Sequence, residues 1–100
     1  MEVKITEQDK TLVAQLAGRL DTAVSQEVSA QLQPLVDNAD RTLILDCKDL
    51  EYISSSGLRI FLTIRKASQA KGGKVIVKGM NDMIRSVFMM TGFLNLFEVQ

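Results

Sequence analysis

Three consecutive serines, Ser54, Ser55 and Ser56, are the residues of this sequence best placed to do chemistry. They follow an apolar stretch and precede Gly57, after which apolar residues recur with helical spacing. The start of a helix needs one side-chain oxygen to accept a hydrogen bond from a backbone N–H group of its first turn. The triplet therefore offers more hydroxyls than capping requires.

Three interpretations of the triplet are open. In the first, one serine caps the helix, with Ser56 as the candidate, and the others line the preceding loop. In the second, a serine is a nucleophile, but the sequence has no histidine to serve as its base and no G-x-S-x-G turn. In the third, a serine accepts a phosphate, which adds about −1.5 to −2 charges where the helix dipole favours negative charge. The third interpretation predicts a binding switch.

The remaining candidates for chemistry are weak. Cys47 is the only cysteine, so it has no thiol partner for a disulfide or a metal, and we interpret it as a small buried apolar residue. Asp21 and Asp46 could form a carboxylate pair, but no third ligand accompanies them, and capping or loop hydrogen bonding explains them better. We therefore expect a protein that is not an enzyme, with no catalytic residue, no bound metal and no cofactor.

Length and composition favour one small domain. The chain has 100 residues, 46% of them hydrophobic, and a formal net charge of +0, so we expect a single domain over residues 1–100. No stretch approaches the roughly 20 apolar residues of a membrane span, and the first ten residues lack the pattern of a leader peptide. We expect a cytoplasmic protein. Its basic residues have no aromatic platform among them, which disfavours nucleic acid as a direct partner.

Alternating strand and helix patterns must position the serines. The expected elements are strands over 3–6 and 11–18, a helix over 22–37, a strand over 41–47, a helix over 56–71, a strand over 74–78, a helix after Asn81, and a short strand or helical turn in the tail. Polar residues 7–10 predict a hairpin, and the later strand–helix–strand units require parallel strands. The sequence thus predicts an α/β sandwich with a mostly parallel sheet of four to five strands, an antiparallel N-terminal strand, and helices mainly on one face.

Local signals refine these elements. Thr22 is a good N-cap for the first helix, and Pro34 predicts that its last turn is kinked or irregular. Residues 48–53 are expected to form a six-residue loop that leads to the serines. In the last helix, Met83 and Met90 share the apolar arc, whereas Met89 falls about 100° outside it, where it could contact a partner.

The stretch "LILDCKDLEYISSSGLRIFL", preceded by "GRLD" and followed by "KGGKVIVKG" and "MMTGFLNLFEV", resembles the STAS domain of bacterial anti-sigma-factor antagonists. The resemblance covers essentially the whole chain. It implies a βα sandwich that binds an anti-sigma factor, itself a serine kinase that holds ATP and Mg²⁺, and thereby frees a sigma factor. The family's D-S-S-G-L motif places the phosphate acceptor on Ser55, with Ser54 standing where the family usually has aspartate. Asp21 and Asp46 match the family's two other recurrent acids.

The resemblance also implies a partner-binding surface around the acceptor. We expect Leu58, Arg59 and Leu62 on the exposed side or edge of the helix that follows the serines. The full set of residues expected to contact the partner is Asp21, Ser54, Ser55, Ser56, Gly57, Leu58, Arg59, Leu62 and Met89. Related STAS proteins also serve as constitutive subunits of stress-signalling scaffolds and lipid-transport complexes, so a subunit whose serines only cap is the alternative function.

Overall fold

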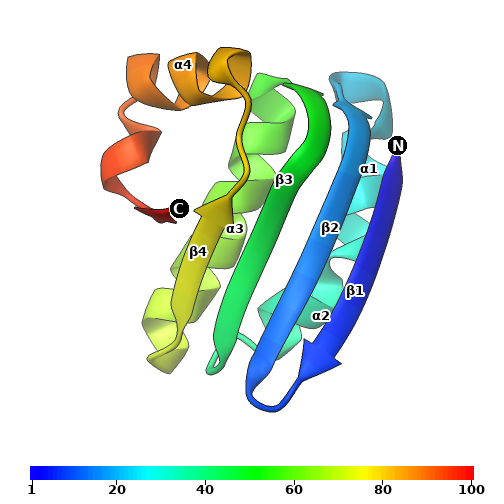
Figure 1. The fold of residues 1–100 in the computed structure, drawn as a ribbon. Helices are drawn as coiled ribbons and strands as arrows, with labels where there is room; N and C mark the ends of the chain where they lie inside the picture. The colour runs from blue at the N-terminus through cyan, green and yellow to red at the C-terminus, as the bar shows by residue number, and fades with distance from the viewer.

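The computed structural model describes residues 1–100 and contains one five-stranded sheet with the strand order β1-β2-β3-β4-β5 (Figure 1). β1 pairs with β2 antiparallel, and the other neighbouring strands pair parallel. The strands are β1 (Glu2–Gln8), β2 (Thr11–Leu20), β3 (Thr42–Ile53), β4 (Lys74–Lys78) and β5 (Glu98–Val99). The helices are α1 (Thr22–Gln31), α2 (Gln33–Asp37), α3 (Ser55–Lys71), α4 (Asp82–Met90) and the 3₁₀ turn η1 (Phe93–Asn95). The predicted fold class is confirmed.

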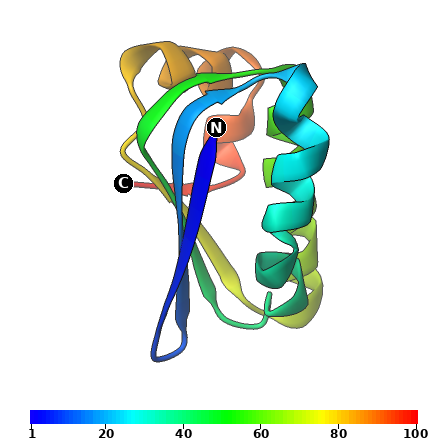
Figure 2. The ribbon, with the colours of Figure 1, turned by 90° about the vertical axis from the view of Figure 1, so that its right-hand side faces the viewer.

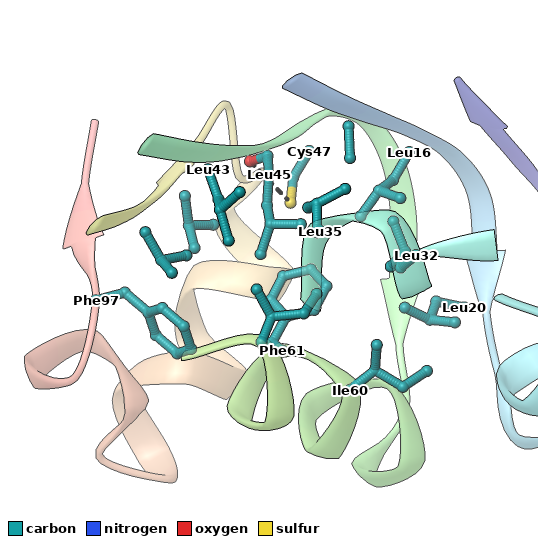
Figure 3. Close-up of a cluster of buried hydrophobic side chains, with 14 of the residues drawn as sticks. Leu16, Leu20, Leu32, Leu35, Leu43, Leu45, Cys47, Ile60, Phe61 and Phe97 are labelled. Carbon is teal, nitrogen blue, oxygen red and sulfur yellow. Dashed lines mark hydrogen bonds between the residues drawn. The ribbon is translucent and has the colours of Figure 1, made fainter. Parts of the chain in front are cut away.

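The core lies between the sheet and the helices on one of its faces. Figure 2 shows α1, α2 and α3 against the same side of the sheet, with the other side uncovered by helices. Side chains of β3 alternate accordingly, with Leu43 and Leu45 buried and Ile44 half-buried on the opposite face. Figure 3 shows these leucines facing Phe61 of α3, which is fully buried. No helix is both long enough and apolar enough to span a membrane.

Cys47 lies inside β3, and its side chain is fully buried. Desolvation and, to a smaller extent, the neighbouring Asp46 carboxylate raise the pKa of the thiol to about 12. The thiol is therefore protonated at neutral pH and is not a nucleophile. The prediction of a small buried apolar residue is confirmed.

The helix expected over residues 22–37 is broken at Leu32 into α1 and α2, and Pro34 lies in the first turn of α2. The predicted irregularity at Pro34 is thus confirmed, because proline fits a first turn but not a helix interior. The prediction that Thr22 is the N-cap is wrong by one residue. Asp21 keeps an extended backbone, and its Oδ1 accepts a hydrogen bond from Val24 N–H at 3.2 Å.

β3 is longer than the sequence pattern suggested, and the expected loop over residues 48–53 is wrong. The end of β2 pairs with this segment, with Leu20 opposite Ile53 and register irregularities on the way. Leu50 and Ile53 are buried in the core, which holds the otherwise polar segment on the sheet. The chain therefore enters α3 directly from a paired strand, so the position of the serines is set by the sheet.

Candidate functional site

Ser54 joins the end of β3 to the start of α3. It has an extended backbone (φ −89°, ψ 172°), and its Oγ accepts a hydrogen bond from Gly57 N–H at 3.2 Å. Its own N–H donates to the Leu20 carbonyl at 2.8 Å, which ties the helix start to the end of β2. Ser54 is only 8% exposed, so it is a structural cap. The prediction that Ser56 caps the helix is therefore wrong.

Ser55 is the first residue of α3 and is exposed, whereas Ser56 is half-buried. The Ser55 hydroxyl makes no hydrogen bond to any other residue, and the cap is already supplied by Ser54. Among the three serines, Ser55 alone combines exposure with a hydroxyl that has no structural task. The Ser55 hydroxyl is therefore the one of the three that is open to solvent and free to react.

Gly57 and Leu58 support the site from inside the molecule. A Cβ atom added at Gly57 would lie 2.7 Å from Leu20 Cγ and 2.8 Å from Ile53 Cγ1, so the helix start packs directly on the ends of β2 and β3. Leu58 is 6% exposed and belongs to the hydrophobic core. Its expected place on the exposed side or edge of the helix is wrong, because it lies one turn before buried Phe61 on the same face.

The two acids are far from forming a pair. Leu20 and Ile53 pair at the ends of β2 and β3, and the caps Asp21 and Ser54 follow them directly. The cap of α1 therefore lies beside the cap of α3 at one edge of the sheet, the edge where β2 and β3 end. Asp46 lies on β3 several residues before this edge, and its Oδ1 accepts a hydrogen bond from Lys48 N–H at 3.1 Å. The structure contains no cluster of three His, Cys, Asp or Glu side chains that could hold a metal ion. The capping role favoured from the sequence is confirmed for Asp21, whereas the hydrogen bond of Asp46 lies within β3 and not in a loop.

Arg59 and Leu62 continue the site along α3. Arg59 is exposed, and Leu62 is half-buried. They lie one and two turns beyond Ser55, so they extend the exposed side of the helix that begins at the free hydroxyl.

Met89 is 62% exposed on α4, as its position outside the apolar arc predicted. Met83 and Met90, which share that arc, are also exposed, at 56% and 85%. α4 is anchored chiefly by buried Ile84 and Phe88, and it lies across the end of the sheet (Figure 1). The core therefore covers only the side of the arc that carries Ile84 and Phe88, and the sequence pattern could not show how narrow this contact is.

One contact at this edge of the sheet, between Arg19 and Tyr52, was not predicted from the sequence. The Arg19 guanidinium lies 4.5 Å from the centre of the Tyr52 ring, in a cation–π arrangement. The two residues are opposite each other in the parallel register of β2 and β3, and each lies two residues before a helix cap, Asp21 or Ser54. That matched spacing is the signal that could have identified the pair.

Comparisons with known proteins agree with this architecture. The model of the STAS domain family matches residues 2–100. The chain is 33% identical over 99 residues, 99% of its length, to BtrV of Bordetella bronchiseptica, of which 85% is covered and which is provisionally named an anti-sigma factor antagonist. It is 26% identical, also over 99 residues, to the anti-sigma-B factor antagonist of Staphylococcus aureus, 92% of which is covered.

Solved structures show the same fold. SpoIIAA, an anti-sigma factor antagonist, superposes in its unphosphorylated form with a TM-score of 0.76 at 20% identity, with 99% of this chain and 87% of that one covered. The Bacillus cell fate determinant SpoIIAA in its phosphorylated form gives a TM-score of 0.75 at 21% identity, with 99% and 91% covered. At these identities the likeness is one of fold.

Proposed function

We propose that this chain, which belongs to the STAS domain family, is an anti-sigma-factor antagonist that is switched by phosphorylation of Ser55. The unmodified form would bind an anti-sigma factor and so release a sigma factor. The names of its relatives support antagonism, and the existence of SpoIIAA in two phosphorylation forms supports a switch. The acceptor assignment is supported by the geometry at the start of α3.

One observation carries the proposal: Ser54 and Ser55 have different roles at the start of α3. Ser54 is buried and caps the helix, whereas Ser55 is exposed and its hydroxyl is free. Aspartate and serine are both strong N-caps. A serine in place of the family's usual aspartate therefore keeps the cap and leaves the next residue presented in the same way. The departure from the motif is compatible with Ser55 as the acceptor.

The fold should tolerate a phosphate at this position. Ser55 lies at the helix N-terminus, where a negative charge is favourable by roughly 0.3 to 1 kcal/mol, and the first turn of α3 contains no acidic residue. An interface that covers Ser55 should not tolerate it. Burying a phosphate whose charge of about −1.5 to −2 is not fully paired costs several kcal/mol, and about 1.4 kcal/mol is tenfold in affinity. Phosphorylation would therefore leave the protein folded and weaken its complex with the anti-sigma factor. This difference makes the modification a switch.

The chemistry of phosphoryl transfer would belong to the partner. We propose that the anti-sigma factor is a serine kinase that holds ATP and Mg²⁺, and that this chain contributes only the acceptor hydroxyl. The chain has no histidine, and no carboxylate accepts a hydrogen bond from Ser55. A panel of esterase, phosphatase and nucleotidase substrates should therefore show no turnover; turnover that is lost in Ser55→Ala would contradict a purely binding role.

The proposed contact surface is smaller than the sequence suggested. Its outward-facing members are Ser55, Arg59 and half-buried Leu62, with Asp21 beside them and Met89 on the helix that crosses the same end of the sheet. Gly57 and Leu58 lie on the buried side of α3 and hold the start of this helix against the core. Their substitution would change the shape of the surface without removing a direct contact.

The experiment is incubation with a cognate anti-sigma kinase and ATP, followed by intact mass and phosphopeptide mapping. We expect one phosphate, on Ser55, and weaker anti-sigma binding after modification. Ser55→Ala should stay unmodified and bind, whereas Ser29→Ala, an exposed serine on α1, should behave as wild type. Phosphate on Ser54 or Ser56, or a phosphorylated form that binds as tightly as the unmodified one, would contradict the mechanism. No modification at all would favour a constitutive STAS subunit.

A further inference from the structure

The chain from residue 52 to residue 81 contains no aspartate or glutamate, although it includes the whole of α3 and β4. The nearest acids in sequence are Glu51 and Asp82. The same segment carries six basic residues: Arg59, Arg65, Lys66, Lys71, Lys74 and Lys78. The basic side chains of α3 must therefore find partners elsewhere in the molecule or remain without one.

Three of these basic side chains have partners outside the segment. Arg65 Nε donates to the Leu96 carbonyl at 2.5 Å, and Lys71 Nζ donates to the Val36 carbonyl at 3.2 Å. Lys74 forms an ion pair with Glu98 at 3.0 Å. Each of these cations connects α3 or β4 to another element of the fold. Their role is structural.

Arg59 and Lys66 differ from these three residues. Both are exposed, and neither forms an ion pair or a side-chain hydrogen bond. Arg59 lies four residues after Ser55, so about 40° separates them around the axis, and the two side chains are neighbours on the helix surface. Lys66 lies on the same side of α3 but about 16 Å further along the axis than Ser55. Among the basic side chains of α3, Arg59 is thus the free cation that an anion on Ser55 can reach.

We infer that Arg59 has two alternative anionic partners: an acidic side chain of the anti-sigma factor when Ser55 is unmodified, and the Ser55 phosphate when it is modified. The inference rests on the proposed function. An acidic group four residues before a basic one is the favourable order on a helix, because the acid also lies nearer the positive end of the dipole. Phosphorylation then removes a cation from the interface in addition to introducing a negative charge.

The capture of the Ser55 phosphate by Arg59 can be tested without the anti-sigma factor. Phosphoserine is incorporated at position 55 by genetic encoding, and the second pKa of the phosphate is measured by ³¹P NMR titration. Arg59→Gln should raise this pKa by about 0.3 unit, the size expected for one helical ion pair. Lys66→Gln removes the same charge from the same side of the helix beyond reach of the phosphate, and it should leave the pKa unchanged. Equal pKa values in wild type and Arg59→Gln would overturn the capture.

The second half of the inference is tested by binding to the anti-sigma factor. Arg59→Gln should weaken binding of the unmodified chain several-fold, and the further loss caused by phosphoserine 55 should be smaller than in wild type. Lys66→Gln should leave the loss caused by phosphoserine at its wild-type size. An Arg59→Gln protein that binds like wild type in both forms would overturn the shared use of Arg59. Failure of the proposed function looks different, because a chain that never binds an anti-sigma factor can still show the NMR shift.

Discussion

The two ends of α3 use their polar groups in opposite ways. At the C-terminal end, Lys71 donates to the carbonyls of Val36 and Asp37 beside the end of α2, and Gly72 closes the helix in the left-handed conformation. At the N-terminal end, Ser54 alone closes the helix, and Ser55 and Arg59 are left exposed and without partners. Polar groups that have no structural task are the ones available to a partner, so the N-terminal end is the functional end in our proposal and the C-terminal end is the structural one.

The functional end is nevertheless held as firmly as the structural one. Ser54 N–H donates to the Leu20 carbonyl, and Gly57 packs on Leu20 and Ile53 with no room for a side chain. These contacts of Ser54 and Gly57 form a frame that fixes the backbone at Ser55, whereas the Ser55 side chain itself is exposed. The comparison therefore predicts that substitutions in the frame disturb stability, and that substitutions of the exposed groups disturb binding.

The largest expected effect is at the structural end. A Cβ at Gly73 would lie 2.0 Å from the Ala39 carbonyl oxygen and 2.6 Å from that of Arg41, both of which belong to backbone. Gly73→Ala should therefore lower the free energy of unfolding by about 3 kcal/mol, measured by urea denaturation. Gly72→Ala is the control, since its Cβ meets open space and only its φ of +76° is unfavourable, at about 1 kcal/mol. Equal losses in the two variants would contradict the packing argument.

Gly57→Val tests the frame at the functional end. The clash is with the side chains of Leu20 and Ile53, which can shift more easily than backbone, so we expect a loss of about 2 kcal/mol. Anti-sigma binding should fall further than this loss of stability explains, because the start of α3 is displaced. Titration calorimetry at a temperature where the variant is folded separates the two effects. Wild-type affinity in a folded Gly57→Val protein would show that the glycine does not shape the surface.

Much of the fold could be predicted from the sequence, because each helix and strand carries its own periodic pattern and its own breaker. The helix over 56–71 differs from α3 by one residue, and the C-cap at Gly72 was signalled by two consecutive glycines. The extension of β3 to Ile53 could not be predicted in this way. Its residues are polar enough for a loop, and only pairing with the far end of β2 makes them a strand.

Within the candidate site, Ser55 as the acceptor stays a prediction, and the role of Ser54 as the cap was not predicted. The resemblance placed the acceptor at Ser55, but three equal hydroxyls gave no local signal that Ser54 caps the helix. The cap depends on where the strand ends, which is set by long-range pairing. Met83 and Met90 are exposed because the core covers only part of the apolar arc of α4. The spacing of apolar residues shows which side of a helix is apolar, but not how much of that side is covered.

Ser54→Ala and Ser56→Ala assign the cap. Loss of the Ser54 oxygen leaves Gly57 N–H without its partner in a buried position, so Ser54→Ala should cost about 1 kcal/mol. Ser56 makes no capping bond, and Ser56→Ala should cost less than about 0.5 kcal/mol. Thermal unfolding followed by circular dichroism is sufficient to rank them. A larger loss in Ser56→Ala would return the cap to Ser56.

The smallest effect on stability is expected at Ser55 itself, and this sharpens the contrast between frame and exposed groups. Ser55→Ala removes no hydrogen bond and should change the free energy of unfolding by less than about 0.5 kcal/mol. Ser55→Asp places a negative charge in the first turn, one turn before Arg59, and should stabilise by about 0.3 to 1 kcal/mol. Binding to the anti-sigma factor should show the opposite order, with Ser55→Ala retained and Ser55→Asp weakened, although one carboxylate carries less charge than a phosphate. Stability and binding then change in opposite directions at one residue, so loss of binding in Ser55→Asp cannot be attributed to unfolding. A Ser55→Asp protein that is less stable than wild type would contradict the expectation that the fold tolerates a negative charge at this position, on which the switch depends.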